Sequence, residues 1–184
     1  MTKAARDQAL LRRLGPYWKM EMGGAVIIPC LVLAKAFPRT PSEVAAVALS
    51  LLGVSSLLLI GGAYWFGVLQ KAKGQPSAHR AVMRIADRTE WPVILLLAAA
   101  WAASAVAFAT SAMSRPVIAA LGCSALATLE YVNYYKVQLQ NFDHAPDLKR
   151  LLSGRGFRRA HLGRDLAALR RGTSITPSAT LSSG

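Results

Sequence analysis

Two long stretches without a charged residue constrain this chain more than any other feature. Residues 44–69 and residues 91–114 contain no Asp, Glu, Lys or Arg. An α-helix needs about 20 residues to cross a hydrocarbon core about 30 Å thick, so either stretch is long enough to span a membrane. The chain is 53% apolar and only 17% charged, whereas an ordinary soluble domain carries about 25% charged residues. We therefore expect an all-α integral membrane protein.

Weaker apolar segments flank both stretches and raise the expected number of spans to four. The segment before them carries Lys19, Glu21 and Lys35, and the segment after them is interrupted by Glu130. The expected fold is a four-helix bundle over residues 1–135, with spans at about 17–37, 44–69, 91–114 and 116–135. The sequence Thr40-Pro41-Ser42-Glu43 predicts a capping box at the start of the second span.

The distribution of basic residues predicts the orientation. Lys and Arg number five up to Lys19, five between residues 70 and 90, and nine after residue 135, while three remain elsewhere: Lys35, Arg39 and Arg115. Nineteen against three is a strong positive-inside asymmetry. We expect a multi-pass protein of the cytoplasmic (inner) membrane, bacterial in style, with both termini in the cytoplasm.

The cytoplasmic segments have amphipathic patterns. In residues 77–88 the charged side chains fall on one helical face, which predicts a separate helix lying along the membrane surface. Residues 136–172 form an expected basic tail, in which Leu162, Leu166 and Leu169 make the apolar stripe of a second amphipathic helix. Residues 173–184 are small and polar, and we expect them to be disordered.

One polar constellation is expected in the cytoplasmic leaflet. Glu130 is an acid inside a span, and such residues are costly and usually functional. Glu130 is expected to lie at the same depth in the cytoplasmic leaflet as polar and aromatic groups from the first and second spans. The candidate binding residues of this layer are Glu130, Glu21, Lys19, Tyr64, Asn133 and Tyr134. A structural ion pair within an interfacial belt is the alternative interpretation of the same residues.

A basic surface is the second candidate site. The run Ser153-Gly154-Arg155-Gly156-Phe157-Arg158-Arg159 follows the last span, and its position favours anionic lipid head groups. Arg80 and Arg84 are expected to join Arg155, Arg158 and Arg159 in contacting lipid phosphate. The alternative is a solvated turn that only obeys the positive-inside rule.

Small residues suggest how the last two spans pack. Ala99, Ala103, Ala107 and Ser111 recur every four residues, as do Ala119, Cys123 and Ala127. Small side chains let transmembrane helices approach closely, so the two rows are expected to face each other. Plain alanine richness would give the same pattern.

The sequence names no reaction. The three histidines lie outside the expected spans, and we find no zinc-protease motif, phosphate-binding glycine loop or nucleophile elbow. We expect no metal, no cofactor and no nucleic-acid partner. The leading hypothesis is a noncatalytic membrane protein whose basic cytoplasmic face binds anionic lipid or a partner subunit. The alternatives are a small oligomeric transporter or channel using Glu130, and an enzyme acting on a lipid-linked substrate at the cytoplasmic leaflet. Catalysis therefore stays open, but the sequence disfavours it.

Overall fold

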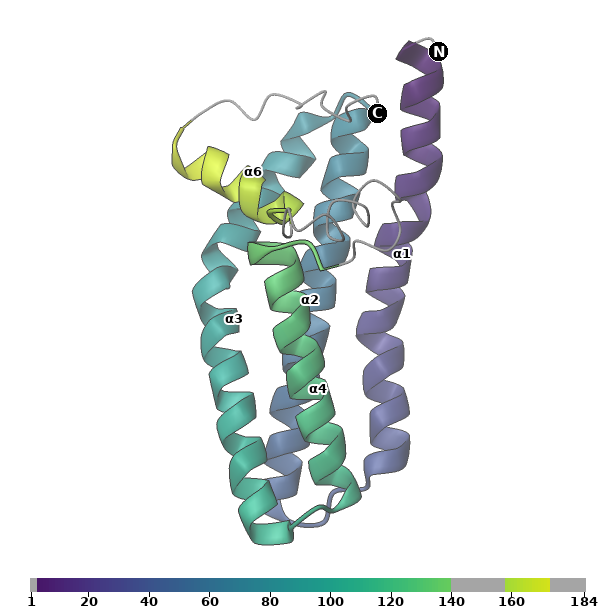
Figure 1. Ribbon diagram of the computed structural model, residues 1–184. Coiled ribbons are helices and arrows are strands. Elements are labelled where there is room, and N and C mark those ends of the chain that lie inside the picture. Colours follow the sequence, from purple (N-terminus) through teal and green to yellow (C-terminus); the bar gives the residue numbers. More distant parts are fainter. Residues whose placement is uncertain (1–2, 140–157, 173–184) are drawn as a thin grey trace, which may run out of the picture. The chain divides into compact units, whose positions relative to one another are not determined.

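The computed structural model describes residues 3–139 and 158–172, with side chains from residue 15 onward. The chain divides into two compact units, Met1–Glu130 and Tyr131–Gly184, which we describe separately. The first unit contains the long helices α1 (Lys3–Ala36), α2 (Pro41–Ala72), α3 (Pro76–Ser111) and nearly all of α4 (Arg115–Tyr131) (Figure 1). The all-helical expectation is confirmed for the described residues.

Three helical segments are long and apolar enough to cross a membrane, by length and composition. They are Pro41–Ala72, Pro76–Ser111 and Arg115–Lys136, each containing an 18-residue stretch with a mean hydropathy of 2.3, 2.2 and 1.2, respectively. The expected spans at 44–69, 91–114 and 116–135 fall almost wholly within them. α1 is not among the three, so the expected span at 17–37 is not confirmed by this criterion.

α2 and α3 form an antiparallel hairpin whose buried residues follow the coiled-coil pattern. In α3 the buried positions are spaced alternately by four and three residues: 79, 83, 86, 90, 93, 97, 100, 104 and 107. In α2 the same spacing connects 43, 47, 50, 54, 57, 61 and 64. Such a 3.5-residue repeat keeps one seam facing the partner helix in a left-handed pair.

The hairpin corrects one prediction. Residues 77–88, expected as a separate helix lying along the membrane, form the first turns of α3 and continue directly into the apolar part of that helix. The turn between α2 and α3 is tight, with Gly74 at a φ of 86° and Pro76 as the first residue of α3. We call this end of the first unit the hairpin end.

α4 packs on α2 and α3 through small side chains. A Cβ atom at Gly53 would lie 3.6 Å from the Cβ of Ala127, and the hydroxyls of Ser104 and Ser124 are 3.4 Å apart. In α4 the expected row is partly correct, since Cys123 and Ala127 are buried. In α3 Ala107 of the expected row is buried, but the other buried small residues are Ala100 and Ser104, because a strict four-residue repeat drifts around a helix with 3.6 residues per turn.

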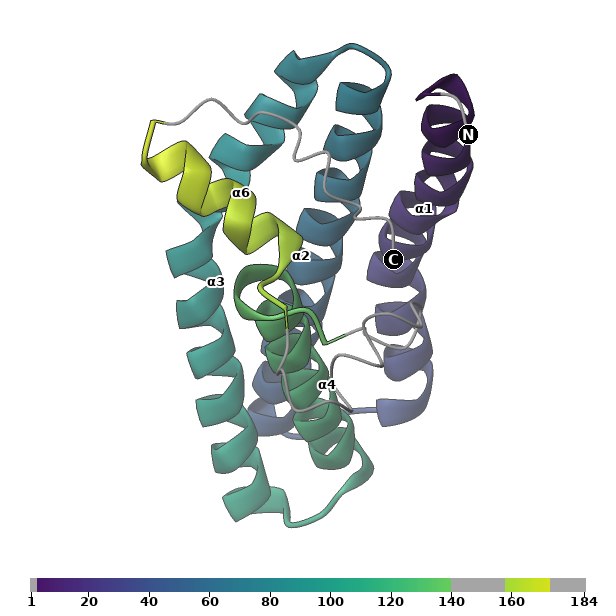
Figure 2. The ribbon, with the colours of Figure 1, turned by 45° about the horizontal axis from the view of Figure 1, so that its top comes forward.

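α1 runs antiparallel along α2 in both ribbon views (Figures 1 and 2). The Ser55 hydroxyl donates to the carbonyl oxygen of Ala25 at 2.9 Å, and a Cβ atom at Gly62 would lie 3.0 Å from Met22. Glycine at position 62 therefore lets the two backbones approach. Most large apolar side chains of α1 point away from this contact and are exposed, among them Val26, Ile27, Leu31 and Leu33.

The opposite end of the first unit, which we call the Thr40 end, is fastened by a polar network. The predicted capping box is confirmed, because the Glu43 amide donates to Thr40 Oγ1 at 3.2 Å and Glu43 Oε2 accepts from the Thr40 amide at 3.2 Å. Ser114 Oγ donates to Glu43 Oε1 at 2.6 Å, and the Ser42 and Thr110 hydroxyls are 2.9 Å apart. The network thus ties α2 to the end of α3 and the start of α4.

The second unit contains a short π-helix, η1 (Val132–Lys136), and the helix α6 (His161–Arg170). An isolated antiparallel bridge pairs Val137 with Arg159. α6 carries the expected apolar stripe on one face, since Leu162 and Leu166 are buried while Arg164 is exposed. Its placement along a membrane surface stays a prediction. The residues 173–184, expected to be disordered, lie outside the described part of the chain.

Candidate functional site

The half of α3 nearest the hairpin end presents a basic face opposite its buried seam. Arg80, Arg84 and Arg88 recur every four residues and are all exposed. No ion pair to these three side chains occurs within the described residues. We call Arg80, Arg84 and Arg88 the arginine face. Within the described part of the chain, these three positive charges are not paired with carboxylates.

The arginine face ends where large exposed apolar side chains begin. Trp91 is 71% exposed and Leu95 is 66% exposed, and both continue the same side of α3. At 1.5 Å per residue, Arg88, Arg84 and Arg80 lie about 5, 10 and 16 Å from Trp91 along the helix axis. A tryptophan between a charged and an apolar stretch is typical of a membrane interface.

Aromatic side chains of α1 and α2 gather near the same end. The ring centroids of Tyr17 and Trp65 are 6.0 Å apart, and those of Trp18 and Phe66 are 5.5 Å apart. The Lys19 ammonium lies 5.9 Å from the Trp18 ring and the side chain is exposed. Lys19 is therefore on the outer surface, and the aromatic pairs hold α1 against α2.

The expected polar layer is divided between two levels of the first unit. Glu21 lies beside α2 at Gly62, where a glycine Cβ would be 3.3 Å from the Glu21 Cβ. Since Gly53 is level with Ala127 and α2 runs parallel to α4, Glu130 is level with about residue 56 of α2. By these contacts the backbone of Glu21 is offset from that of Glu130 by up to about six residues, or about 9 Å, along the axis.

Tyr64 turns toward α3 and contacts a residue that the sequence analysis did not select. Its ring centroid lies 6.0 Å from that of His79, which is 1% exposed. A Cβ atom at Gly67 would lie 3.2 Å from the Cα of His79, so that glycine permits the close approach of the two helices. Tyr64 and His79 thus belong to the seam of the hairpin.

Asn133 and Tyr134 belong to the second unit and have local roles there. The side-chain oxygen of Asn133 accepts from the Leu139 amide at 2.9 Å, which ties the backbone after η1 to the π-helix. Tyr134 is buried. The amide of Asn133 is therefore already engaged in holding the backbone that follows the π-helix.

The basic residues expected to bind lipid phosphate in the tail are only partly described. Arg158 and Arg159 are exposed just before α6, and the Gln138 amide donates to the Arg158 carbonyl at 2.8 Å. The backbone is closely packed here, because a Cβ atom at Gly163 would overlap the carbonyl oxygen of Tyr135. Arg155 lies outside the described residues.

Sequence reasoning missed the buried polar residues of the hairpin seam. His79 and Glu90 are buried together with Met83 and Ala86. The signal was present in the alternating four and three spacing, which runs without a break from residue 79 to residue 107. Within residues 77–88 alone, a different apolar face, through Val82 and Ile85, hides this repeat.

No group of three or more His, Cys, Asp or Glu side chains that could hold a metal ion occurs among the described residues. Chemically, α3 offers an exposed cationic face that is followed by an exposed apolar surface at Trp91 and Leu95. Its opposite side packs closely in the seam of the hairpin. Comparison with protein-family models, with curated proteins and with solved structures finds no match to this chain.

Proposed function

We propose that this chain is a noncatalytic integral membrane protein that binds anionic lipid head groups through the basic residues of its hairpin end. The observation that carries this proposal is the arginine face of α3. Three exposed guanidiniums stand in a row above Trp91, and none has an ion pair within the described residues. Anionic lipids attract such residues by about 1 kcal/mol each near the membrane surface.

The proposal includes four spans in a cytoplasmic membrane, with the hairpin end and both termini in the cytoplasm. Its support for a fourth span is the packing of α1 along α2, since the Ser55 hydroxyl reaches the Ala25 carbonyl in the middle of the apolar stretch of α2. Its support for the orientation is the excess of Lys and Arg in the segments assigned to the cytoplasm.

The depth of each residue follows from these spans. About 20 residues counted from Pro41 and from Ser111 put the cytoplasmic edge of the hydrocarbon near residue 61 of α2 and residue 91 of α3. Both helices continue beyond that edge, by about 11 residues in α2 and 15 in α3, or about 16 to 22 Å. Arg88 then lies among the head groups, and Arg80 stands well above them.

The packing between the spans supports a binding role over a transport role. Ser50, Val54 and Leu57 of α2 have zero exposure, as do Ala100 and Ser104 of α3. Small and medium side chains therefore fill the contact between the helices across the middle of the expected membrane. A transport path through the bundle would have to open this contact.

The test uses the different distances of Arg88, Arg84 and Arg80 from the proposed membrane edge. In mixed micelles of phosphatidylglycerol and phosphatidylcholine, we expect Arg88→Gln to lower the preference for the anionic lipid about fivefold, Arg84→Gln by less, and Arg80→Gln least. The order follows because electrostatic attraction fades within a Debye length of about 8 Å at physiological salt. The three variants change the same charge, so each serves as a control for the others. Equal preference in all three variants and in the unmodified protein would refute the proposal.

A further inference from the structure

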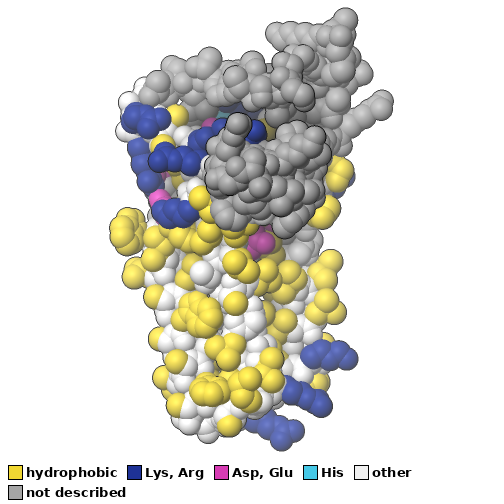
Figure 3. Space-filling view, in the orientation of Figure 1, with side chains coloured by type: hydrophobic (Ala, Val, Ile, Leu, Met, Phe, Trp, Pro, Cys, Tyr) yellow, Lys and Arg dark blue, Asp and Glu magenta, His cyan; other side chains and the backbone are white. Residues whose placement is uncertain are grey.

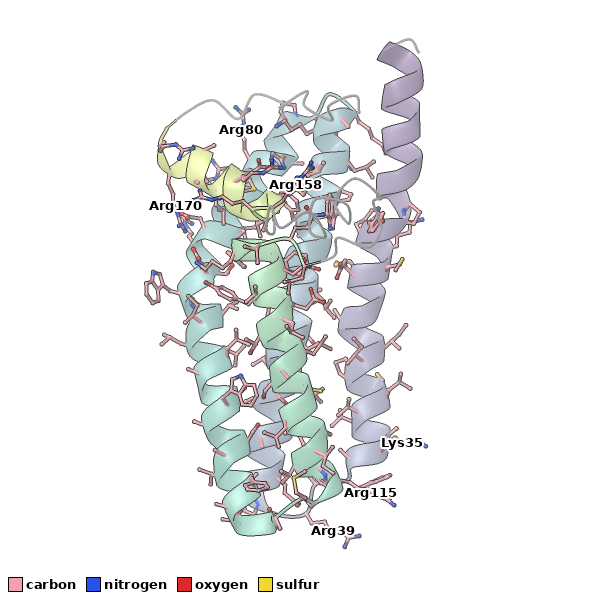
Figure 4. The ribbon with its side chains drawn as sticks, viewed as in Figure 1. Lys35, Arg39, Arg80, Arg115, Arg158 and Arg170 are labelled. Atoms are coloured by element: carbon pink, nitrogen blue, oxygen red, sulfur yellow. The ribbon has the colours of Figure 1, made fainter. Side chains whose placement is uncertain are left out.

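A second group of cations lies at the Thr40 end, far from the arginine face along the same unit. Lys35 is in the last turn of α1, Arg39 is in the loop before α2, and Arg115 is the first residue of α4. All three side chains are exposed and project outward from this end, where they are labelled in Figure 4. They come from three separate segments that the fold brings to one edge.

The acidic residue at this end makes no ion pair with these cations. Glu43 is 4% exposed, and its carboxylate oxygens accept from the Arg39 amide at 2.8 Å, the Thr40 amide at 3.2 Å and the Ser114 hydroxyl at 2.6 Å. Its negative charge is thus held inside the turn by backbone and hydroxyl donors. Within the described residues, the side chains of Lys35, Arg39 and Arg115 have no ion pair.

Large exposed apolar side chains adjoin the three cations. Phe37 lies between Lys35 and Arg39 and is 65% exposed, and Met113, two residues before Arg115, is 60% exposed. Dark-blue basic side chains stand beside yellow hydrophobic ones at this edge in Figure 3. A soluble anion would use only the cations, whereas a lipid carries a phosphate and acyl chains and fits both parts of the surface.

We propose that Lys35, Arg39 and Arg115 bind the phosphate groups of anionic lipids in the leaflet at the Thr40 end, while Phe37 and Met113 insert among the acyl chains. This lipid contact is separate from the one proposed at the hairpin end. It depends on the membrane character of the helices and not on which side of the membrane the Thr40 end faces. Both leaflets would then supply anionic lipid to the same protein.

The test places a fluorophore beside the proposed contact. Ala109 is exposed near the end of α3, so Ala109→Cys can carry the dye in a Cys30→Ser background, while Cys123 is buried. The full chain is reconstituted in phosphatidylcholine vesicles containing phosphatidylglycerol, and either lipid carries a nitroxide quencher. Competition between the two lipids gives the local preference for the anionic one.

The decisive variant replaces Lys35, Arg39 and Arg115 together by Gln. Each cation near a charged surface contributes about fivefold in affinity, or about 1 kcal/mol. We therefore expect the preference at position 109 to fall at least tenfold. A variant that exchanges Lys for Arg and Arg for Lys at the same positions should keep it. The free energy of unfolding in lipid-free detergent should not change. If the triple variant does not fold, the three single Gln variants replace it, and the lipid preference of each should fall about fivefold.

The arginine face supplies a charge-matched control. Replacing Arg80, Arg84 and Arg88 by Gln should leave the signal at position 109 unchanged and alter that of a dye at Ile85→Cys, an exposed position beside Arg84 and Arg88. A loss at 85 without a loss at 109 in the respective variants would overturn this inference and leave the proposed function standing, and the reverse would do the opposite. Displacement of lipid by inorganic phosphate, beyond that caused by chloride at equal ionic strength, would show a soluble-anion site and also overturn it.

Discussion

Truncating two fully buried side chains of similar size tests where the membrane edge lies. The loss in free energy of unfolding depends on whether each side chain faces lipid or water in the unfolded protein. Leu57 of α2 and Met83 of α3 both have zero exposure. Under the proposed depth, Leu57 lies about four residues inside the hydrocarbon edge and Met83 about eight residues outside it, or about 6 and 12 Å. The surroundings of the two residues in the unfolded protein should therefore differ.

Truncation to Ala separates two contributions to the free energy of unfolding. In water, a buried Leu or Met replaced by Ala costs about 2 to 5 kcal/mol, which includes transfer of the removed atoms and the cavity left behind. Three groups at about 0.8 kcal/mol each make the transfer part about 2.4 kcal/mol. In a membrane the unfolded side chain still faces apolar surroundings, so the transfer part is absent and the cavity part remains.

We therefore expect Met83→Ala to cost about 3 kcal/mol and Leu57→Ala about 1 kcal/mol. The assay is unfolding of the purified protein in mild detergent by added sodium dodecyl sulfate, followed by tryptophan fluorescence. Leu52→Ala and Ile85→Ala, at exposed positions of the same two helices, serve as controls and should change stability little. A loss for Leu57→Ala equal to or larger than that for Met83→Ala would refute the proposed membrane edge.

Four further outcomes follow from the structure. Gly163→Ala should destabilise the second unit by at least about 1 kcal/mol in thermal unfolding, because the new Cβ would overlap a backbone carbonyl oxygen. Ala112→Gly should raise the melting temperature by the equivalent of about 1 kcal/mol, since a φ of 50° is strained for alanine and relaxed for glycine. Cysteine reagents applied outside intact cells should label a cysteine near Arg39 and not one at Gly74, and labelling at Gly74 would contradict the orientation. Glu130→Gln tests the structural ion-pair interpretation, in which a cation left unpaired in the inner leaflet lowers stability by about 3 kcal/mol while anionic-lipid binding persists. A stable variant that loses binding or transport would favour the transporter hypothesis.

Features that depend on local patterns could be predicted from the sequence. The uncharged run 44–69 and the capping box at Thr40 both lie within single segments, and the structure contains the helix and the cap as expected. The Leu162 and Leu166 face of α6 is local in the same sense. Each of these features requires only periodicity, charge or one turn of backbone.

Features that depend on register between helices could not be predicted in this way. The expected layer containing Glu21 and Glu130 was built by counting each depth from an assumed span boundary. The contacts of Gly62 and Gly53 place the backbones of the two residues at different levels of the bundle, up to about 9 Å apart along the axis. A shift of a few residues in one helix is invisible in its own sequence, because the same apolar composition allows several registers.

The continuous seam of α3 shows why a membrane boundary need not be a structural boundary. A helix in hydrocarbon and a helix in water can bury the same face, since the coiled-coil repeat depends on the partner helix and not on the solvent. His79 and Met83 accordingly continue the repeat that contains Ala100 and Ser104. What changes at the edge is the opposite face, from the exposed Trp91 and its apolar neighbours to arginines. Under the proposed depth, the seam would hold the arginine face at a fixed height above the lipid, and a rigid row of charges at graded heights is what the Arg80, Arg84 and Arg88 variants would detect.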